Sequence, residues 1–219
     1  MNRPKMVTLA LAICCVSCEP GKFGRTSESD RWDAVYARKE PSFNTKPNAF
    51  LAEVVKGRRP GKALDIGMGQ GRNAILLAEM GWDVTGVDIS ERGLVLAREH
   101  AEKLGLKLNA VRAPIEEFDM GDRRWDLIVS MYMHGVTVHN ASRIEKALKP
   151  GGVLVVEGFH RDVMKQGAKT LNEGSLGFET NGLLRAFPSL RIEHYEDTTG
   201  FGDWSNRESP VVRMVARKE

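Results

Sequence analysis

The feature that most constrains this chain is a short apolar run followed at once by three alternating glycines. Residues 62–66, Lys-Ala-Leu-Asp-Ile, predict a buried strand. Gly67, Gly69 and Gly71 come directly after it. Glycine adopts positive φ and lets a ligand approach bare backbone. Residues 72–80 then predict a helix that a further glycine stops. Strand, glycine turn and helix indicate a cofactor site at the carboxyl edge of a parallel sheet.

The spacing of the glycines narrows the choice of cofactor. A dinucleotide site uses Gly-x-Gly-x-x-Gly, where the helix N-terminus receives a pyrophosphate. Here the glycines alternate, and Asp65 stands two residues before the first of them. A carboxylate at this place suits a ligand with an ammonium and a sulfonium better than one with phosphates. The pattern therefore disfavours a nicotinamide oxidoreductase. The next strand, 83–87, leads into Asp88, where an acid can accept the two ribose hydroxyls of an adenosine.

The rest of the chain alternates between expected strands and helices. Such alternation predicts an α/β fold, a doubly wound and mostly parallel sheet with helices on both faces. Seven strands are expected in total. After Asp88 the expected helices cover 90–104, 141–148 and 183–187, the expected strands cover 107–111, 125–130, 153–157, 190–195 and 211–217, and a Lys-Pro-Gly-Gly turn covers 149–152.

The acid-x-Gly-x-Gly-x-Gly run from Asp65 to Gly71 resembles the first motif of the class I S-adenosylmethionine-dependent methyltransferases. The resemblance extends from about Trp32 to the C-terminus, and Lys-Pro-Gly-Gly before the fifth strand also recurs in that class. It implies a Rossmann-like sheet that closes with an antiparallel C-terminal hairpin. In detail, residues 70–73 and 81–88 are most similar to the tellurite-resistance and thiopurine methyltransferases.

The resemblance implies S-adenosyl-L-methionine as the cofactor and methyl transfer by in-line displacement. In this class the protein mainly positions the reactants. Gly67 and Gly69 would approach the methionine part, Asp88 would hold the ribose, and residues 113–115 would flank the adenine. The full set of expected cofactor-binding residues is Asp65, Gly67, Met68, Gly69, Gly71, Asn73, Asp88, Ile89, Ala113, Pro114, Ile115, Ser130 and Met131.

Three residues are candidates for the acceptor side. His134 follows the fourth strand and His160 follows the fifth, at the edge where such folds build their sites. A histidine there can take a proton from an incoming nucleophile, and Arg161 can hold an anionic substrate. The alternative is that these are loop histidines that bond to backbone or water. No two histidines have the spacing of a zincin helix, so no metal site is expected.

The acceptor is expected to be a small molecule. Ser-Met-Tyr-Met at 130–133 stands where amino-group methyltransferases of nucleic acids carry Asn/Asp-Pro-Pro-Tyr. A net charge of +3 is also too balanced for a protein that binds by neutralising phosphates. The similar group methylates soft nucleophiles, which predicts a sulfur, selenium or tellurium acceptor. The alternative is a catalytically silent protein that binds the cofactor or serves as an envelope-tethered scaffold.

The N-terminal residues form a separate segment. Two basic residues precede the apolar run 6–16, and Cys18 ends a pattern like that of a secretory or lipoprotein signal. We therefore expect a signal-like segment at 1–18, a linker at 19–30 and the methyltransferase domain at 31–219. Because the cofactor is made inside the cell, a cytoplasmic location is favoured. Export or lipid anchoring through 1–18, with membrane attachment, is the alternative.

Overall fold

The computed structural model describes residues 27–39, 43–166, 177–204 and 206–219. The expected signal or anchor at 1–18, and most of the expected linker, lie outside these residues. Within the described part, no helix has both the length and the apolar character needed to cross a bilayer.

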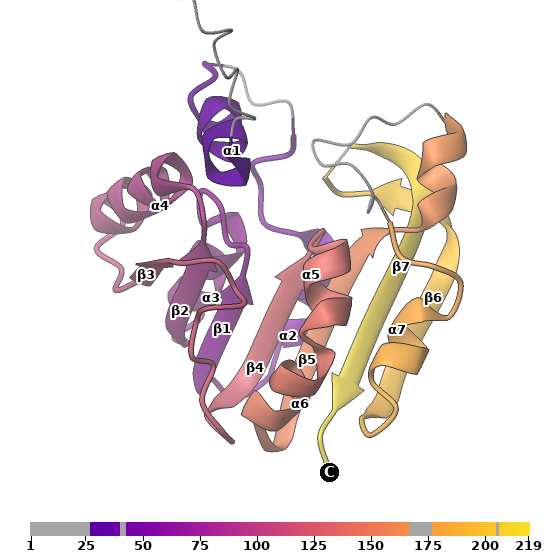
Figure 1. Cartoon of the computed structure of the whole chain (residues 1–219). Coiled ribbons are helices and arrows are strands. Elements are labelled where there is room, and N and C mark those ends of the chain that lie inside the picture. The colour runs from indigo at the N-terminus through magenta and orange to yellow at the C-terminus, as the bar shows by residue number, and fades with distance from the viewer. Residues whose placement is uncertain (1–26, 40–42, 167–176, 205) are drawn as a thin grey trace, which may run out of the picture.

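Seven strands form one sheet, as predicted (Figure 1). β1 pairs in parallel with β2 on one side and with β4 on the other. The parallel part continues outward, because β2 also pairs with β3 and β4 also pairs with β5. β7 is antiparallel to both of its neighbours, β5 and β6. In spatial order the strands are β3 (Asn109–Arg112), β2 (Asp83–Asp88), β1 (Lys62–Ile66), β4 (Trp125–Met131), β5 (Leu148–Phe159), β7 (Arg207–Arg217) and β6 (Arg191–Gly202).

The strand order reverses between β1 and β4. From β1 the chain builds outward through β2 to β3, and it then crosses back to place β4 on the other side of β1. In open parallel sheets, ligands bind outside the carboxyl ends of the strands at such a switch point. The glycine turn follows β1 at this point, so the topology itself indicates where a ligand would bind.

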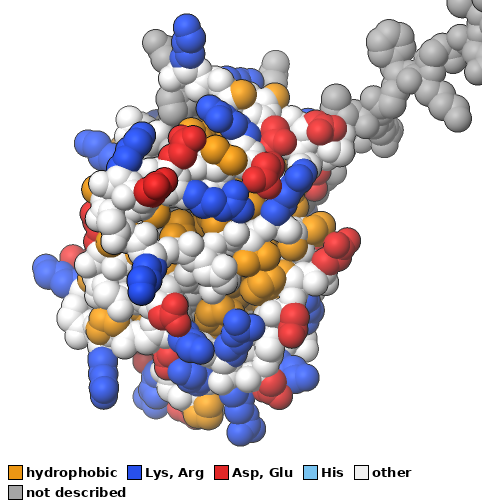
Figure 2. Space-filling view, turned by 90° about the vertical axis from the view of Figure 1, so that its left-hand side faces the viewer, with side chains coloured by type: hydrophobic (Ala, Val, Ile, Leu, Met, Phe, Trp, Pro, Cys, Tyr) orange, Lys and Arg blue, Asp and Glu red, His pale blue; other side chains and the backbone are white. Residues whose placement is uncertain are grey.

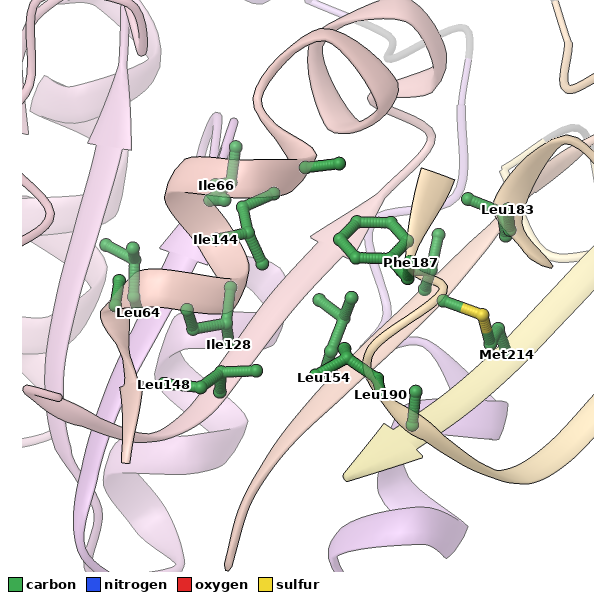
Figure 3. Packing of buried hydrophobic residues seen from close by; sticks show 14 of the residues in the cluster. Leu64, Ile66, Ile128, Ile144, Leu148, Leu154, Leu183, Phe187, Leu190 and Met214 are labelled. Atoms are coloured by element: carbon green, nitrogen blue, oxygen red, sulfur yellow. The ribbon is translucent and has the colours of Figure 1, made fainter. Parts of the chain in front are cut away.

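Helices cover both faces of the sheet and give it two apolar cores. One core packs α6 and α7 on the sheet, with Ile144 and Phe187 over Leu64, Ile128 and Leu154 (Figure 3). The other core packs α2, α3 and α4 on the opposite face. The helices are α1 (Glu28–Tyr36), α2 (Ala49–Val55), α3 (Arg72–Glu79), α4 (Glu91–Lys103), α5 (His134–His139), α6 (Ala141–Ala147) and α7 (Gly182–Ala186), with a 3-10 turn η1 (Arg161–Gln166).

The expected linker at 19–30 overlaps the first helix, which is a correction to the predicted boundary. Ser27 caps α1: its hydroxyl accepts the Asp30 N–H, and the Asp30 carboxylate accepts the Ser27 N–H. This reciprocal pair satisfies two backbone donors that a helix start leaves free. Ser29 also donates to the Ile89 carbonyl, so residues 27–30 belong to the folded domain.

Three local expectations differ from the structure. The Lys-Pro-Gly-Gly turn at 149–152 lies inside β5, where Gly151 has φ of 80° and the register with β4 shifts. The third strand covers 109–112 rather than 107–111. Residues 134–139 form the helix α5, which was not predicted. This six-residue helix is rich in valine, threonine and histidine, which have little helical preference of their own. Its helical conformation therefore depends on tertiary packing.

The β6–β7 hairpin is longer than the two predicted strands. Its strands contain 12 and 11 residues, and the pairing continues to Gly202 and Arg207. In Figure 1 the upper end of this ribbon bends over the carboxyl edge of the sheet. The hairpin tip, which begins with Asp203 and Trp204, therefore returns to the edge where the glycine turn lies.

We predict that truncating Leu154, a fully buried residue in the α6–α7 core, lowers the free energy of unfolding. Leu154→Ala should cost about 3 kcal/mol, because transfer and cavity terms add in a packed core. Leu104→Ala is the matched control, since the Leu104 side chain is 47% exposed. Chemical denaturation measures both variants. A loss below about 1 kcal/mol for Leu154→Ala would contradict this packing.

Candidate functional site

The glycine turn is tied to the neighbouring strand by its own backbone. The N–H groups of Gly67 and Met68 donate to the Val87 carbonyl at 2.8 and 3.1 Å. The three turn glycines have φ of 69°, 55° and 81° in chain order, a region in which a residue with a Cβ is strained. The Met68 side chain packs inward, into the space above Gly86. Met68 thus anchors the turn from behind.

Asp65, at the penultimate position of β1, is buried beside this turn and only half satisfied. Its side chain is 1% exposed, and the Ala74 N–H in the first turn of α3 donates to its carboxylate. The Oδ2 atom has no hydrogen-bond partner in the described structure. Burial raises the pKa of Asp65 to about 7, the Arg72 guanidinium opposes that rise, and the Asp88 carboxylate adds to it. A buried polar atom without a partner is costly, so this oxygen points to a missing donor.

Asp88 ends β2 and holds the glycine turn from the other side. Its two carboxylate oxygens accept the N–H groups of Gly69 and Ser90, each at 2.8 Å. Burial raises the pKa of Asp88, against the lowering effect of these two bonds. The Ile89 N–H is a third backbone donor, and because a carboxylate has about four acceptor positions, acceptor capacity remains for a further donor. Asp65 and Asp88 thus present acceptor oxygens on both sides of one turn.

α1 and the segment after β4 lie directly over the turn. A Cβ built on Gly69 would be 2.1 Å from the Tyr36 hydroxyl, and one on Gly67 would be 2.3 Å from the Met133 sulfur. Asp33 fixes α1 to the start of α4, because its Oδ1 accepts the Ser90 hydroxyl at 2.5 Å. A ligand at the turn would therefore share the bare backbone with these two side chains or displace them.

The remaining expected cofactor residues lie in three sets around the turn. The segment 113–115 begins with an Ala113 N–H that donates to the Asp88 carbonyl, so it lies beside the turn, although the Ile115 side chain is buried in a core. Ser130 and Met131 are buried at the end of β4, where the Ser130 hydroxyl bonds to Thr137. Asn73 accepts a backbone N–H from Asn48, and the Ile89 carbonyl accepts the Ser29 hydroxyl.

The three acceptor-side candidates are already engaged with other groups. His134 is buried, and its Nε2 accepts the Phe159 N–H at 2.9 Å. Burial lowers the pKa of His134 to about 4, which keeps the ring neutral. His160 accepts the Asp162 N–H at Nδ1 and contacts the Thr180 hydroxyl at Nε2, both at 3.1 Å. Arg161 forms an exposed ion pair of 2.6 Å with Glu179.

Sequence reasoning missed a buried polar cluster around Glu157, near the end of β5. This fully buried carboxylate accepts from Asn48 Nδ2, Tyr132 Oη and Arg213 Nε, each at 2.7 Å. The Tyr132 N–H also donates to the Glu157 carbonyl, and Tyr132 has φ of 61°. A bulky residue in this region is strained, and such strain persists where surrounding bonds hold it. The acid after the apolar run 153–156 was the only signal in the sequence.

A second missed cluster joins the hairpin tip to the start of α3. Arg72 follows Gly71 and forms a buried ion pair with Asp203. Its guanidinium also donates to the Lys46 carbonyl at 3.0 Å and lies 5.7 Å from the Trp204 ring centroid. Trp204 stacks on Phe43 at 4.3 Å. Segments far apart in the chain therefore meet beside the turn.

Two surface features lie apart from the glycine turn. A groove of about 600 Å³ separates α2 from the β6–β7 ribbon, and within it Glu193 pairs with Arg58 and Glu196 pairs with Arg213. Figure 2 shows acidic and basic side chains interspersed on one face of the molecule. Among the residues that the structure describes, no three His, Cys, Asp or Glu side chains gather as metal ligands would.

Comparisons with known proteins show that this chain is similar to methyltransferases. Residues 63–152 match the family model described as a methyltransferase domain. A ubiquinone biosynthesis O-methyltransferase of Bordetella avium is 34% identical over 152 residues, which is 62% of each chain. A probable S-adenosyl-L-methionine-dependent methyltransferase, TehB of Haemophilus influenzae, is 35% identical over 100 residues, 43% of this chain and 35% of that protein. This chain therefore spans less than two thirds of the length of these curated relatives.

Solved structures show the same fold. TehB from Haemophilus influenzae superposes with a TM-score of 0.65 and 23% identity, over 78% of this chain and 62% of that one. A second solved structure comes from work on the conversion of a disulfide bond into a thioacetal group during echinomycin biosynthesis. It superposes with a TM-score of 0.69 and 21% identity, over 87% of this chain and 93% of that one. Family and fold imply S-adenosyl-L-methionine as the cofactor, and the unpaired Asp65 oxygen fits its ammonium group. Residues 63–152 thus match a methyltransferase domain, and the chain is similar in sequence and fold to class I S-adenosylmethionine-dependent methyltransferases such as TehB.

Proposed function

We propose that this chain binds S-adenosylmethionine at the glycine turn and transfers its methyl group to a small-molecule acceptor. The observation that carries the proposal is the buried Asp65 carboxylate, which leaves one oxygen unpaired beside three glycines of positive φ. Asp88 adds free acceptor capacity on the adjacent strand end. An ammonium and a pair of ribose hydroxyls are the donors that these two groups would satisfy.

The expected residues take different roles in this proposal. Asp65 binds the ammonium group, Asp88 the ribose hydroxyls and the 113–115 backbone borders the adenine. Gly67 and Gly69 offer main chain to the methionine part. Five of the expected residues, Met68, Asn73, Ile115, Ser130 and Met131, support the site from behind, because they are buried. Gly71 begins α3, and Ile89 carries the bond that docks α1.

The acceptor side favours a soft nucleophile. The cofactor supplies an already activated methyl group when bound, so the acceptor needs an available lone pair. The Nε2 atom of His134 and both ring nitrogens of His160 are engaged, so neither is poised to take a proton from a neutral hydroxyl. A thiol is partly ionised near neutral pH and a chalcogen oxyanion is already anionic, so these acceptors depend less on such a base than a neutral hydroxyl does. His160 and Arg161 remain the candidates for contact with an acceptor.

We place the enzyme in the cytoplasm because its cofactor is made there. The alternative is that residues 1–18 direct export or lipid anchoring, with the domain of about 27–219 attached to a membrane. Fractionation of cells that express the full chain distinguishes the two, because an anchored chain would sediment with membranes.

Asp88→Ala should raise the dissociation constant of S-adenosylhomocysteine about tenfold or more. Each lost hydrogen bond to a charged group costs about 1.5–3 kcal/mol, and 1.4 kcal/mol corresponds to tenfold. Isothermal titration calorimetry measures the constant. Asp83→Ala, at the exposed start of the same strand, is the control and should bind as the parent does. Unchanged affinity in Asp88→Ala would remove the ribose assignment.

Binding of S-adenosylhomocysteine should tighten as the pH rises from about 6 to about 8. Burial raises the pKa of Asp65 to about 7, so below that pH the carboxyl must lose its proton before it can pair with an ammonium. Affinity should therefore fall up to about tenfold per pH unit below 7 and level off above it. Asp65→Asn should bind more weakly with a flat profile. If the affinity of both proteins changed with pH to the same extent, the pH dependence would belong to a group other than Asp65.

The acceptor class can be tested by assaying the full chain for transfer of a radiolabelled methyl group to a panel of candidate acceptors. Thiols, selenite and tellurite should be methylated with higher kcat/KM than phenols or amines, because the contacts of His134 and His160 leave neither of them free to act as a base. Preferential methylation of phenols would contradict the soft-acceptor proposal and favour oxygen as the methylated atom. Cofactor binding without transfer to any acceptor would favour the catalytically silent alternative.

A further inference from the structure

Arg72 lies near two buried carboxyl groups and is bound to one of them. Its side chain and that of Asp203 are 6% and 7% exposed, and the two form an ion pair. The Asp65 side chain is also buried, and the Arg72 charge partly offsets the rise in the pKa of Asp65 that burial causes. Yet Asp65 Oδ2 has no partner in the described structure. The guanidinium therefore serves Asp203 and leaves Asp65 open.

The hairpin tip holds Asp203 in this position. Asp203 directly follows β6, and its Oδ1 accepts Asn44 Nδ2 at 3.2 Å while its Oδ2 accepts from Arg72. The Asn44 N–H donates to the Trp204 carbonyl, and the Trp204 ring stacks on Phe43. Bonds from two sides thus fix the tip over the start of α3. The Asp203 carboxylate reaches Arg72, the residue after the glycine turn, only because the hairpin extends this far.

We infer that Asp203 is a positioning residue of the cofactor site: by holding the Arg72 guanidinium, it keeps Asp65 available to the ammonium group of the cofactor. The inference rests on the proposed function, in which Asp65 binds that ammonium. If Arg72 paired with Asp65 instead, a fixed cation would neutralise the carboxylate and repel the ligand's own cation. The Arg72–Asp203 pair carries no net charge, so the negative charge of Asp65 is left for the ligand.

A purely supporting role for the ion pair makes different predictions. Buried ion pairs are often no more stable than apolar side chains of similar size, so stability alone does not explain why this pair stands here. A supporting role would affect every ligand of the turn alike. A role in reserving Asp65 would affect only ligands that carry the ammonium group. The two roles can therefore be separated by the choice of ligand.

The test is calorimetry on the full chain with two ligands. S-adenosylhomocysteine carries the ammonium group, whereas 5′-methylthioadenosine has the adenosine and thioether without the amino-acid part. Asp203→Asn should raise the dissociation constant of the first about tenfold, because Arg72 then turns to Asp65, and that of the second less than about twofold. Asp126→Asn is the matched control: Asp126 also forms an ion pair, with Lys149 at 2.7 Å, but near the other end of β4. It should leave both ligands unaffected.

A double variant guards against a folding defect, because Asp203→Asn leaves a buried arginine without its counter-ion. Arg72→Gln combined with Asp203→Asn removes both charges, so nothing competes for Asp65. This protein should bind S-adenosylhomocysteine within about twofold of the parent. Equal weakening of both ligands in Asp203→Asn, unchanged affinity for S-adenosylhomocysteine, or weak binding by the double variant would overturn the inference. If the parent chain binds neither ligand, the proposed function fails as well.

Discussion

The site depends on the hydrogen bonds that fold the glycine turn back onto β2. Gly67 and Met68 donate to the Val87 carbonyl, and Gly69 donates to the Asp88 carboxylate. These bonds require a backbone of positive φ at alternate positions, which glycine adopts without a steric penalty. The same bonds bring the ends of β1 and β2 together. Asp65 in β1 and Asp88 at the end of β2 thus lie on either side of one turn, because these bonds hold the turn against β2.

Three buried carboxylates near the carboxyl edge differ in how completely they are paired. Glu157 is fully bonded by Asn48, Tyr132 and Arg213, and Asp203 is paired with Arg72. Asp65 alone among them keeps an unpaired oxygen in the described structure. A buried charge is strongly unfavourable unless it is paired, so an unpaired one indicates a role in binding. The contrast singles out Asp65 as the group that needs a ligand.

Local patterns predicted the parts of the fold that local chemistry determines. The strand at 62–66, the turn glycines and the Ser90 cap of α4 depend on periodicity, positive φ and capping within a few residues, and all appear in the structure. The strand count and the antiparallel end of the sheet, which the family resemblance implied, are also present.

The parts that escaped prediction depend on residues far apart in the chain. Arg72 and Asp203 meet only because the hairpin is long enough to reach α3, and no local pattern measures that reach. The Glu157 cluster likewise draws one residue each from the start of α2, the end of β4 and the middle of β7. His134 looked like a candidate base because it follows a strand. Only the structure shows that its acceptor nitrogen already binds the Phe159 N–H.

The central claim is that the glycine turn binds the adenosyl and methionine parts of one ligand between Asp65 and Asp88. A crystal structure of the full chain with S-adenosylhomocysteine tests this most directly. We predict density for the amino group at Asp65 Oδ2 and for the ribose hydroxyls at Asp88, with Tyr36 and Met133 beside the ligand or moved away from it. Density for the ligand elsewhere, or a turn still covered by Tyr36 and Met133 at saturating ligand, would contradict the account.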